Sequence, residues 1–349
     1  MRLSDYVVSF LEEKGIEHVF TLSGGGCLYL VDSLGSSDIK YVCNLHEQGA
    51  AICAEAYAQY TNKPSALLVT TGPGGTNAIT GVASAWLDSI PMIILSGQVP
   101  RKDMKGSRKV RQIGFQELDI VDMVKPITKY ATTVMDSKDI KYTLQKGYHL
   151  ATTGRQGPVW IDIPLDVQST QIDEKELKSF KPPESTDRSE ELKEKIDKLY
   201  NLLNSSERPI ILAGNGIRSS GGLEKFLSLV KELKIPVLTT WKAIDFMDEN
   251  DSYFVGRPGI AGQRGANFSQ QNSDLFISIG ARLDLGQTAF NHKNFARCAK
   301  KVIVDIDEEE IKKMEFDVEC SLDFDALEVI EEMTAQIDKL DSNFSEWLS

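Results

Sequence analysis

Short apolar runs rich in Val and Ile alternate with helix-like segments along the chain, and this alternation restricts the fold more than any other feature. Runs short enough to be buried strands are 41–45, 66–70, 92–95, 159–163, 209–213, 236–240, 274–279 and 301–306. Segments with the apolar spacing of an amphipathic helix are 49–60, 76–88, 137–153 and 223–233. Such alternation is typical of parallel sheets with crossover helices. The sequence therefore predicts an α/β protein built from doubly wound parallel sheets.

A polar segment separates the chain into two parts. Residues 171–189 are dense in charge, contain Pro182 and Pro183 and have few apolar residues, as expected of a surface linker. A length of 349 residues also fits two domains of ordinary size. We therefore predict one α/β domain over 1–170 and a second, Rossmann-like domain over 190–340.

Charge and cysteine usage exclude several classes of protein. Lys and Arg number 39 against 51 Asp and Glu, which gives a net charge of −12 and disfavours nucleic-acid binding. The five cysteines are scattered without a CxxC pair, which indicates reduced thiols and no zinc site. No apolar run is long enough to cross a bilayer, and residues 1–12 lack the pattern of a signal peptide. We expect a cytoplasmic protein with no nucleic-acid partner and no membrane partner.

Three strand-to-helix junctions in the first domain carry residues suited to ligand binding. Glu47 follows the strand over 41–45, and glycine-rich turns lie at 23–26 and 72–75. In a parallel sheet such junctions fall at the carboxyl ends of strands, where ligands of α/β proteins usually bind. Glycine also allows the backbone to approach a ligand closely. Two other interpretations stay open at this point, because Glu47 can complement the positive end of the following helix and glycines can make tight connections.

Several motifs of the first domain occur together in one order and spacing. They are 46–50 (HEQGA), 71–77 (TGPGGTN), 88–91 (DSIP), 96–99 (SGQV), 115–120 (FQELDI), 153–159 (TGRQGPV) and 162–164 (DIP). In order and spacing they resemble the first domain of thiamine-diphosphate enzymes of the acetolactate synthase type. The resemblance covers the whole of 1–170 and identifies this part as the pyrimidine-binding domain.

The resemblance implies a thiamine diphosphate site with one catalytic residue, Glu47. Its carboxyl group would hydrogen-bond the aminopyrimidine ring and favour the imino tautomer, whose nitrogen removes the thiazolium C2 proton. The other positions that match cofactor contacts are Ser23, Gly24, Pro73, Asn77 and Gln116. The family more often has proline in place of Ser23, whose loop approaches the cofactor of a partner subunit.

The resemblance continues less sharply in the second domain, through the segments 210–216, 235–237, 273–284 and 302–307. The matching central domain holds FAD in the synthases and nothing in many relatives. Positions that match flavin contacts are Gly214, Gly216, Arg282, Asp284 and Asp305. The turn at 214–216 lacks the third glycine of a dinucleotide fingerprint. Bound FAD and a structural or vestigial cleft are therefore both open.

The family's third domain has no counterpart in this sequence. That domain holds Mg²⁺ and the diphosphate through Gly-Asp-Gly and a later Asn, whose oxygen ligands suit Mg²⁺. No Gly-Asp-Gly occurs in the 349 residues. We therefore expect the Mg²⁺ ligands in a missing domain, residues 341–349 to begin the connection to it, and the chain alone to be inactive.

The resemblance implies the N-terminal portion of a 2-keto acid decarboxylase or carboligase, a homodimer or homotetramer with a shared active site. The alternatives are a non-catalytic nucleotide- or flavin-binding module and one subunit of a split enzyme. The stretch 258–268 departs from the usual synthase pattern and leaves the product open. Six basic residues lie within 101–111. They could attract a carboxylate or phosphate substrate, and a solvated loop would have the same sequence.

Overall fold

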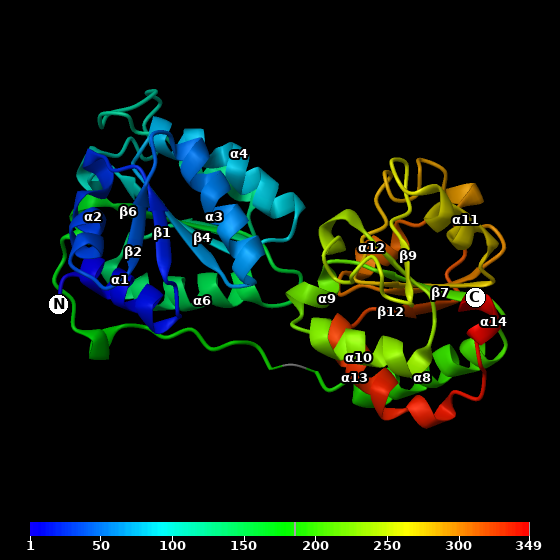
Figure 1. Cartoon of the computed structure of the whole chain (residues 1–349). Helices are drawn as coiled ribbons and strands as arrows, with labels where there is room; N and C mark the ends of the chain where they lie inside the picture. Colours follow the sequence, from blue (N-terminus) through cyan, green and yellow to red (C-terminus); the bar gives the residue numbers. More distant parts are fainter. Residues whose placement is uncertain (185, 349) are drawn as a thin grey trace. The chain divides into compact units, whose positions relative to one another are not determined.

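The computed structural model describes residues 1–184 and 186–348. The chain forms two compact units, Met1–Glu184 and Ser185–Ser349, each with its own parallel sheet of six strands and helices on both faces (Figure 1). This architecture confirms the predicted α/β fold class. The predicted domains, 1–170 and 190–340, fall inside these two units.

The first sheet has the strand order β2-β1-β3-β4-β6-β5. Its strands are β1 (His18–Thr21), β2 (Lys40–Cys43), β3 (Ser65–Val69), β4 (Met92–Gln98), β5 (Tyr130–Thr133) and β6 (Val159–Pro164). Strands β3, β4 and β6 are buried along their whole length, because helices cover both faces of the sheet. This burial explains why they appear in the sequence as nearly continuous apolar runs.

Two apolar layers enclose the first sheet. The helices are α1 (Leu3–Glu13), α2 (Leu28–Gly35), α3 (Glu47–Thr61), α4 (Pro73–Leu87), α5 (Ile120–Val124), α6 (Ile140–Thr152) and α7 (Leu165–Gln168). Helices α1, α2, α6 and α7 pack on one face, and α3, α4 and α5 pack on the other. Neighbouring strand residues such as Leu67 and Leu68 point to opposite layers.

Local signals fix the starts of the two helices that carry predicted site residues. The His46 ring accepts a hydrogen bond from the backbone N–H of Gln48 at 3.1 Å, which caps α3 and makes Glu47 its first residue. Pro73 occupies the first position of α4, where its missing N–H costs nothing. The helix starts therefore lie directly at the carboxyl ends of β2 and β3.

The second sheet has the order β12-β11-β10-β7-β8-β9. Its strands are β7 (Pro209–Ala213), β8 (Val237–Thr239), β9 (Phe254–Gly256), β10 (Leu275–Ile279), β11 (Lys300–Val304) and β12 (Cys320–Leu322). Its helices are α8 (Ser189–Asn204), α9 (Gly216–Ser219), α10 (Leu223–Leu233), α11 (Arg264–Asn272), α12 (Glu308–Lys312), α13 (Ala326–Ala335) and α14 (Ser345–Leu348). Helices α8, α10 and α13 pack on one face, and α11 and α12 pack on the other.

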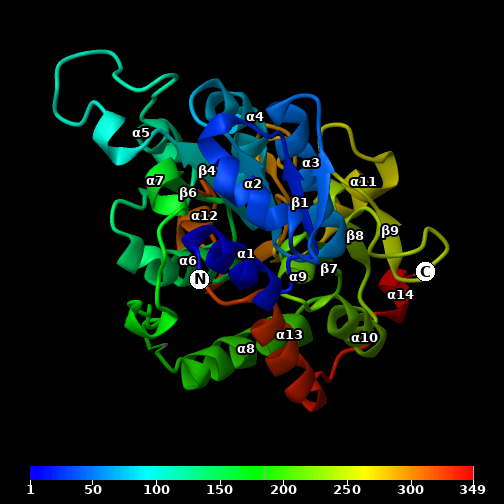
Figure 2. The same cartoon turned by 90° about the vertical axis from the view of Figure 1, so that its left-hand side faces the viewer.

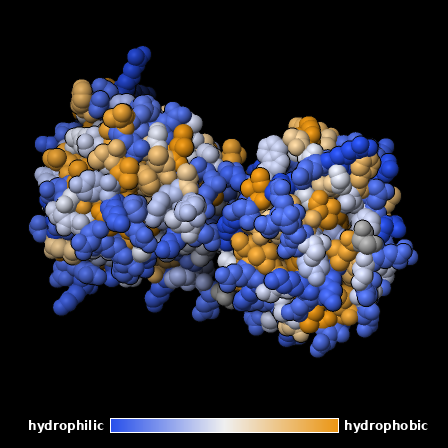
Figure 3. Space-filling model, in the orientation of Figure 1, coloured by the Kyte–Doolittle hydropathy of each residue, from blue (hydrophilic) through white to orange (hydrophobic). Residues whose placement is uncertain are grey.

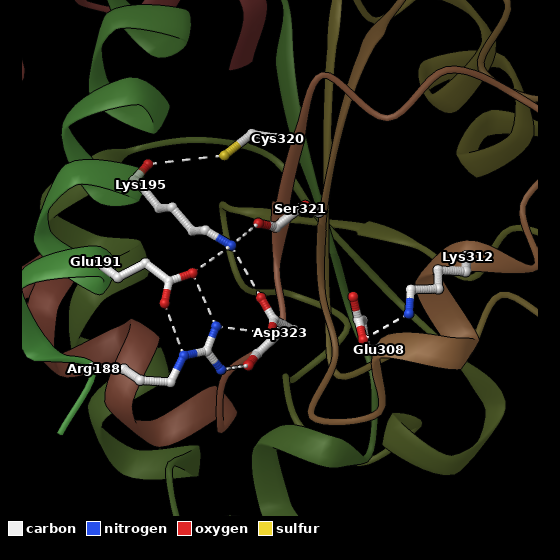
Figure 4. A network of polar contacts seen from close by, with 8 residues as sticks. All are labelled: Arg188, Glu191, Lys195, Glu308, Lys312, Cys320, Ser321 and Asp323. Carbon is white, nitrogen blue, oxygen red and sulfur yellow. Dashed lines mark hydrogen bonds and ion pairs between the residues drawn. The ribbon is translucent and has the colours of Figure 1, made fainter. Parts of the chain in front are cut away.

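A network of charged side chains ties the start of α8 to the edge strand β12 (Figure 4). Arg188 donates to Glu191 and to Asp323 at 2.8 Å, while the Lys195 ammonium donates to Asp323 at 3.0 Å and to the Ser321 carbonyl at 2.9 Å. Although partial burial acts in the opposite direction, hydrogen bonds from Lys195 and Arg188 lower the pKa of Asp323. The network thus covers one edge of the second sheet with charge, which opposes pairing with another strand.

Residues near the end of the chain pack onto the second unit. Phe344 is buried in its larger apolar cluster, and the Trp347 indole N–H donates to the Pro209 carbonyl at 2.9 Å. Phe344 and Trp347 therefore have a packing role in this unit.

Candidate cofactor site

The first sheet reverses its direction of growth between β1 and β3, and this position locates the candidate site. The chain adds β2 on one side of β1 and then returns to add β3 on the other side. Helix α2, which follows β1, packs on one face of the sheet, and α4, which follows β3, packs on the other. Ligands of doubly wound sheets bind at such a switch point, outside the carboxyl ends of the strands. Here the loops that leave β1 and β3 border it.

Glu47 is a buried carboxylate at this edge. Its side chain is only 7% exposed, and the Asn77 side-chain amide donates to its Oε2 at 2.9 Å. A Cβ added at Gly74 would lie 3.4 Å from Oε1. No residue that the structure describes donates a hydrogen bond to Oε1. One carboxylate oxygen is therefore fixed, and the other remains available to a ligand.

The loop after β1 packs directly on the loop after β3. A Cβ at Gly24 would lie 2.5 Å from the Thr70 Cβ, so no larger residue fits there. The Gly26 N–H donates to Thr70 Oγ1 at 3.0 Å. Ser23 is exposed on the same loop. The structure therefore brings Ser23 and Gly24 to the edge that carries Glu47, a few residues from the turn with Pro73.

Gln116 reaches the same turn through its backbone. Gly72 has φ +62°, and a Cβ there would lie 2.3 Å from the Gln116 carbonyl oxygen. Gln116 itself has φ +61°, an uncommon conformation for a residue with a side chain. The structure thus gathers all predicted cofactor contacts of the first domain at one edge of the sheet: Ser23, Gly24, Glu47, Pro73, Asn77 and Gln116.

The basic segment forms a loop whose base is anchored beside this edge. The buried Glu117 carboxylate accepts hydrogen bonds from the backbone N–H groups of Lys105 at 2.5 Å, Ile113 at 2.8 Å and Gly114 at 3.3 Å. At the start of the loop, Arg101 forms an ion pair with Asp166 at 2.8 Å. The loop projects from its unit next to α5, and hydrophilic atoms dominate the projection in the space-filling view (Figures 2 and 3). Its cations are therefore displayed to solvent near the Gln116 turn.

A buried polar cluster below this edge was not assigned any role from the sequence. Asp162, 1% exposed, accepts hydrogen bonds from Ser96 at 2.6 Å, Gln98 at 3.1 Å and Thr133 at 3.1 Å. Loss of hydration raises the pKa of Asp162 to about 7, although these three hydrogen bonds act in the opposite direction. The available sequence signal was polar residues inside the apolar strands β4 and β6.

In the second unit, the predicted flavin contacts also lie at a switch point, between β7 and β10. A Cβ at Gly214 would lie 2.2 Å from the Gly280 carbonyl oxygen, and one at Gly216 would lie 2.7 Å from the Gly280 Cα. Contact between backbone segments therefore explains both glycines without a ligand.

The charged residues of that set share the same sheet edge. Arg282 is exposed and forms an ion pair with Asp284 at 3.4 Å, and Asp305, which follows β11, accepts a hydrogen bond from the Asp307 N–H at 3.0 Å. The structure thus brings the five residues to one edge, but their glycine turn is not evidence for a flavin.

Two absences hold for the ranges 1–184 and 186–348. No group of three or more His, Cys, Asp or Glu side chains is placed to hold a metal ion. Among the helices of these ranges, none combines the length and the apolar character needed to cross a membrane.

Comparison with known proteins identifies the class to which these two domains belong. Residues 1–123 match the N-terminal TPP-binding domain of thiamine pyrophosphate enzymes, and residues 196–333 match the central domain of the same enzymes. Thiamine pyrophosphate is another name for thiamine diphosphate. The chain therefore belongs to the thiamine pyrophosphate enzymes and contains their N-terminal and central domains, which confirms the resemblance found in the sequence.

Its relatives include named synthases. The acetolactate synthase large subunit of Lactococcus lactis is 33% identical over 99% of this chain and 59% of its own length. The probable acetolactate synthase large subunit of Methanocaldococcus jannaschii is 36% identical over 90% of this chain and 52% of its own length. Acetolactate synthase 3, chloroplastic, of Brassica napus is 36% identical over 89% of this chain and 47% of its own length. The chain thus spans about half the length of the curated relatives it matches.

Replacing Gly72 tests the contact that places the Gln116 turn. Gly72→Ala should lower the free energy of unfolding by about 1–3 kcal/mol more than Gly15→Ala, because both glycines have positive φ but only Gly72 faces a backbone atom. Urea unfolding of the two variants measures the difference. An equal decrease in the free energy of unfolding in both variants would show that the contact of Gly72 with Gln116 does not contribute to stability.

The buried Asp162 predicts a specific pH dependence of stability. Its carboxyl group has an ordinary pKa of 3.8 but titrates near 7 in the folded protein, so the unfolded chain releases its proton first. The contribution of Asp162 to the free energy of unfolding therefore falls as pH rises from about 4 to about 7, by roughly 4 kcal/mol, and is constant above. Relative to wild type, Asp162→Asn should gain stability across this window in thermal unfolding. Asp38→Asn, at an exposed position of the same unit, controls for the substitution, and parallel curves for Asp162→Asn and wild type would contradict the prediction.

Proposed function

We propose that this chain is the N-terminal two-domain portion of a thiamine-diphosphate-dependent enzyme that acts on 2-keto acids. Its activity would be that of a decarboxylase or carboligase, in the lyase or transferase class, as the synthase names of its relatives suggest. The observation that carries the proposal is the buried Glu47 carboxylate, held by Asn77 at the switch point of a domain of this family.

The donor set at the switch point suits an aminopyrimidine ring. Oε1 of Glu47 can hold a proton at a ring nitrogen, while the hydrogen bond from Asn77 keeps Oε2 in place. Gly74 packs against the Thr70 side chain close to Oε1, and the exposed Pro73 and the Gln116 backbone lie at the same edge. In this proposal Glu47 orients the ring and exchanges a proton with it, and the turn at 72–75 limits where the ring can lie.

Thiamine diphosphate, when bound, supplies the electron sink for cleavage of the bond between a keto carbon and its carboxylate. Mg²⁺ would bind the diphosphate through hard oxygen ligands. We place those ligands outside this chain, in the third domain that the family uses for this purpose. The contribution of the present residues is confined to the ring and to the walls around it.

We further propose a cytoplasmic homodimer or homotetramer in which the site is completed by another subunit. Two large apolar side chains beside the site support this arrangement, since Leu45 is 101% exposed and Phe115 is 81% exposed. Residues of this size in solvent next to a binding site are typical of surfaces that a partner covers. A 2-keto acid would then react in a space shielded from water.

Glu47→Gln tests the assignment without requiring the substrate. In the protein purified from its natural source, with any chain that accompanies it, the exchange of the thiazolium C2 proton of bound thiamine diphosphate with D₂O can be followed by NMR. The substitution should slow this exchange by about 10²–10⁴-fold, because glutamine cannot exchange a proton with the ring. Exchange at the wild-type rate would contradict the role of Glu47.

Glu55→Gln is the control for this experiment. Glu55 lies on the same helix as Glu47 and is also 7% exposed, but it is about 12 Å further along the helix axis and accepts a hydrogen bond from Gln59. The same chemical change there should leave the exchange rate within about twofold of wild type. Equal slowing in both variants would assign the effect to helix α3 as a whole.

A non-catalytic flavin- or nucleotide-binding module is the second candidate function, and it is supported by the switch point between β7 and β10. Bound FAD is compatible with the leading proposal as well, because the resemblance implies FAD in the central domain of the synthases. A non-catalytic module is distinguished by flavin absorption bands without any exchange of a thiazolium C2 proton. Flavin bands in stoichiometric amount would favour the second unit as a working site.

A further inference from the structure

Gln98 links the two segments that border the candidate site. It is 2% exposed at the end of β4, and every hydrogen-bonding position of its amide is used. Its Nε2 donates to Asp162 Oδ2 at 3.1 Å and to the Leu118 carbonyl at 2.9 Å. Its Oε1 accepts from Thr71 Oγ1 at 2.9 Å and from the Val99 N–H at 3.0 Å. The side chain therefore joins three separate parts of the first unit.

The two outer partners stand next to the proposed ring contacts. Thr71 directly precedes the turn at 72–75, and Leu118 lies two residues after Gln116. These segments also touch each other, because Gly72 packs against the Gln116 carbonyl. The Gln98 amide is thus the polar bridge that sets the distance between the segments beneath that contact.

The backbone partners of the Gln98 amide decide which way it points. The Leu118 carbonyl can only accept a hydrogen bond, so Nε2 faces Leu118 and Asp162. The Val99 N–H can only donate one, so Oε1 faces Val99 and Thr71. Asp162 is itself held by Ser96 and Thr133. A reversed amide would leave these buried groups without partners, which is costly. The charged groups that bear on this carboxylate include Asp119 on the neighbouring segment.

A second link stiffens the same cluster. The Trp160 indole N–H donates to Ser96 Oγ at 2.8 Å, and Ser96 in turn donates to Asp162 at 2.6 Å. Trp160 is fully buried in the layer formed by α3, α4 and α5. The position of Asp162 is therefore fixed by packing as well as by hydrogen bonds.

We propose that Gln98, oriented by its four hydrogen bonds, is a positioning residue that holds the turn at 72–75 and the segment at 116–118 at the separation required by the ligand. It acts through Thr71 and Leu118 and has no contact with the ligand. The identity of that ligand as the aminopyrimidine of thiamine diphosphate rests on the proposed function. The positioning role of Gln98 does not depend on the proposed function.

The test compares Gln98→Met with Thr133→Val in this chain by hydrogen–deuterium exchange. Each substitution removes one donor to Asp162 Oδ2 at 3.1 Å, but only Gln98 is bonded to Thr71 and Leu118. Gln98→Met should speed amide exchange in both segments by roughly tenfold or more, and Thr133→Val should not. Equal effects of the two variants, or no effect of Gln98→Met, would overturn the proposal.

Thr71→Val keeps the test decisive if Gln98→Met fails to fold. It removes only the hydrogen bond to Gln98 Oε1. Faster exchange should then appear at 72–75 and not at 116–118, since the bond to Leu118 remains. Faster exchange throughout the first unit, or unchanged exchange at 72–75, would contradict the inference.

A second readout concerns the cofactor. In the protein from its natural source, Gln98→Met should raise the half-saturating concentration of thiamine diphosphate by about tenfold, whereas Thr133→Val should leave it unchanged. The two proposals fail separately. If Glu47→Gln exchanged the C2 proton at the wild-type rate, the proposed function would fail but the amide-exchange result would stand. If Gln98→Met left amide exchange unchanged, this inference would fail but the role of Glu47 would stand.

Discussion

The parallel pairing of β1 with β3 is the constraint on which the first unit depends. It places Val19 beside Ala66 and Thr21 beside Leu68, so the carboxyl ends of the two strands lie next to each other. The loops that leave them contact each other at once, through Gly26 and Thr70. Because the chain turns to opposite faces after these strands, the loops border the switch point at which ligands of such sheets usually bind. Glu47 and Asn77 face each other at the same edge because α3 and α4, which begin there, pack together on one layer.

The sequence was sufficient for the strands with continuous apolar runs and for the site motifs, but not for four short strands, of which β1 lies inside its sheet. All eight strands expected from apolar runs exist. Burial on both faces explains seven of these runs, whereas β2 is an exposed strand at the edge of its sheet. The strands β1, β5, β9 and β12 were not predicted. They are only three or four residues long, and their polar or small residues give no continuous apolar run. What makes each of them a strand is a neighbour far away in the sequence.

The candidate site shows the same division. Glu47 and Asn77 were expected from family motifs, and their direct hydrogen bond agrees with a common site. Gln98 and Asp162 lay inside the motifs of the first domain but had no assigned role. The two residues are 64 positions apart and meet only when β4 pairs with β6. The glycines at 214 and 216 show the opposite case. Their pattern suggested a ligand, but no local sequence reveals that the Gly280 backbone already lies against them.

The central claim is that Glu47 at the first switch point holds the aminopyrimidine ring of thiamine diphosphate. The most direct measurement is a crystal structure of the protein from its natural source, with any chain that accompanies it, bound to this cofactor. The account predicts a ring nitrogen within hydrogen-bonding distance of Glu47 Oε1, with the Asn77 amide still on Oε2. A cofactor bound elsewhere, or a ring without contact to Glu47, would contradict it.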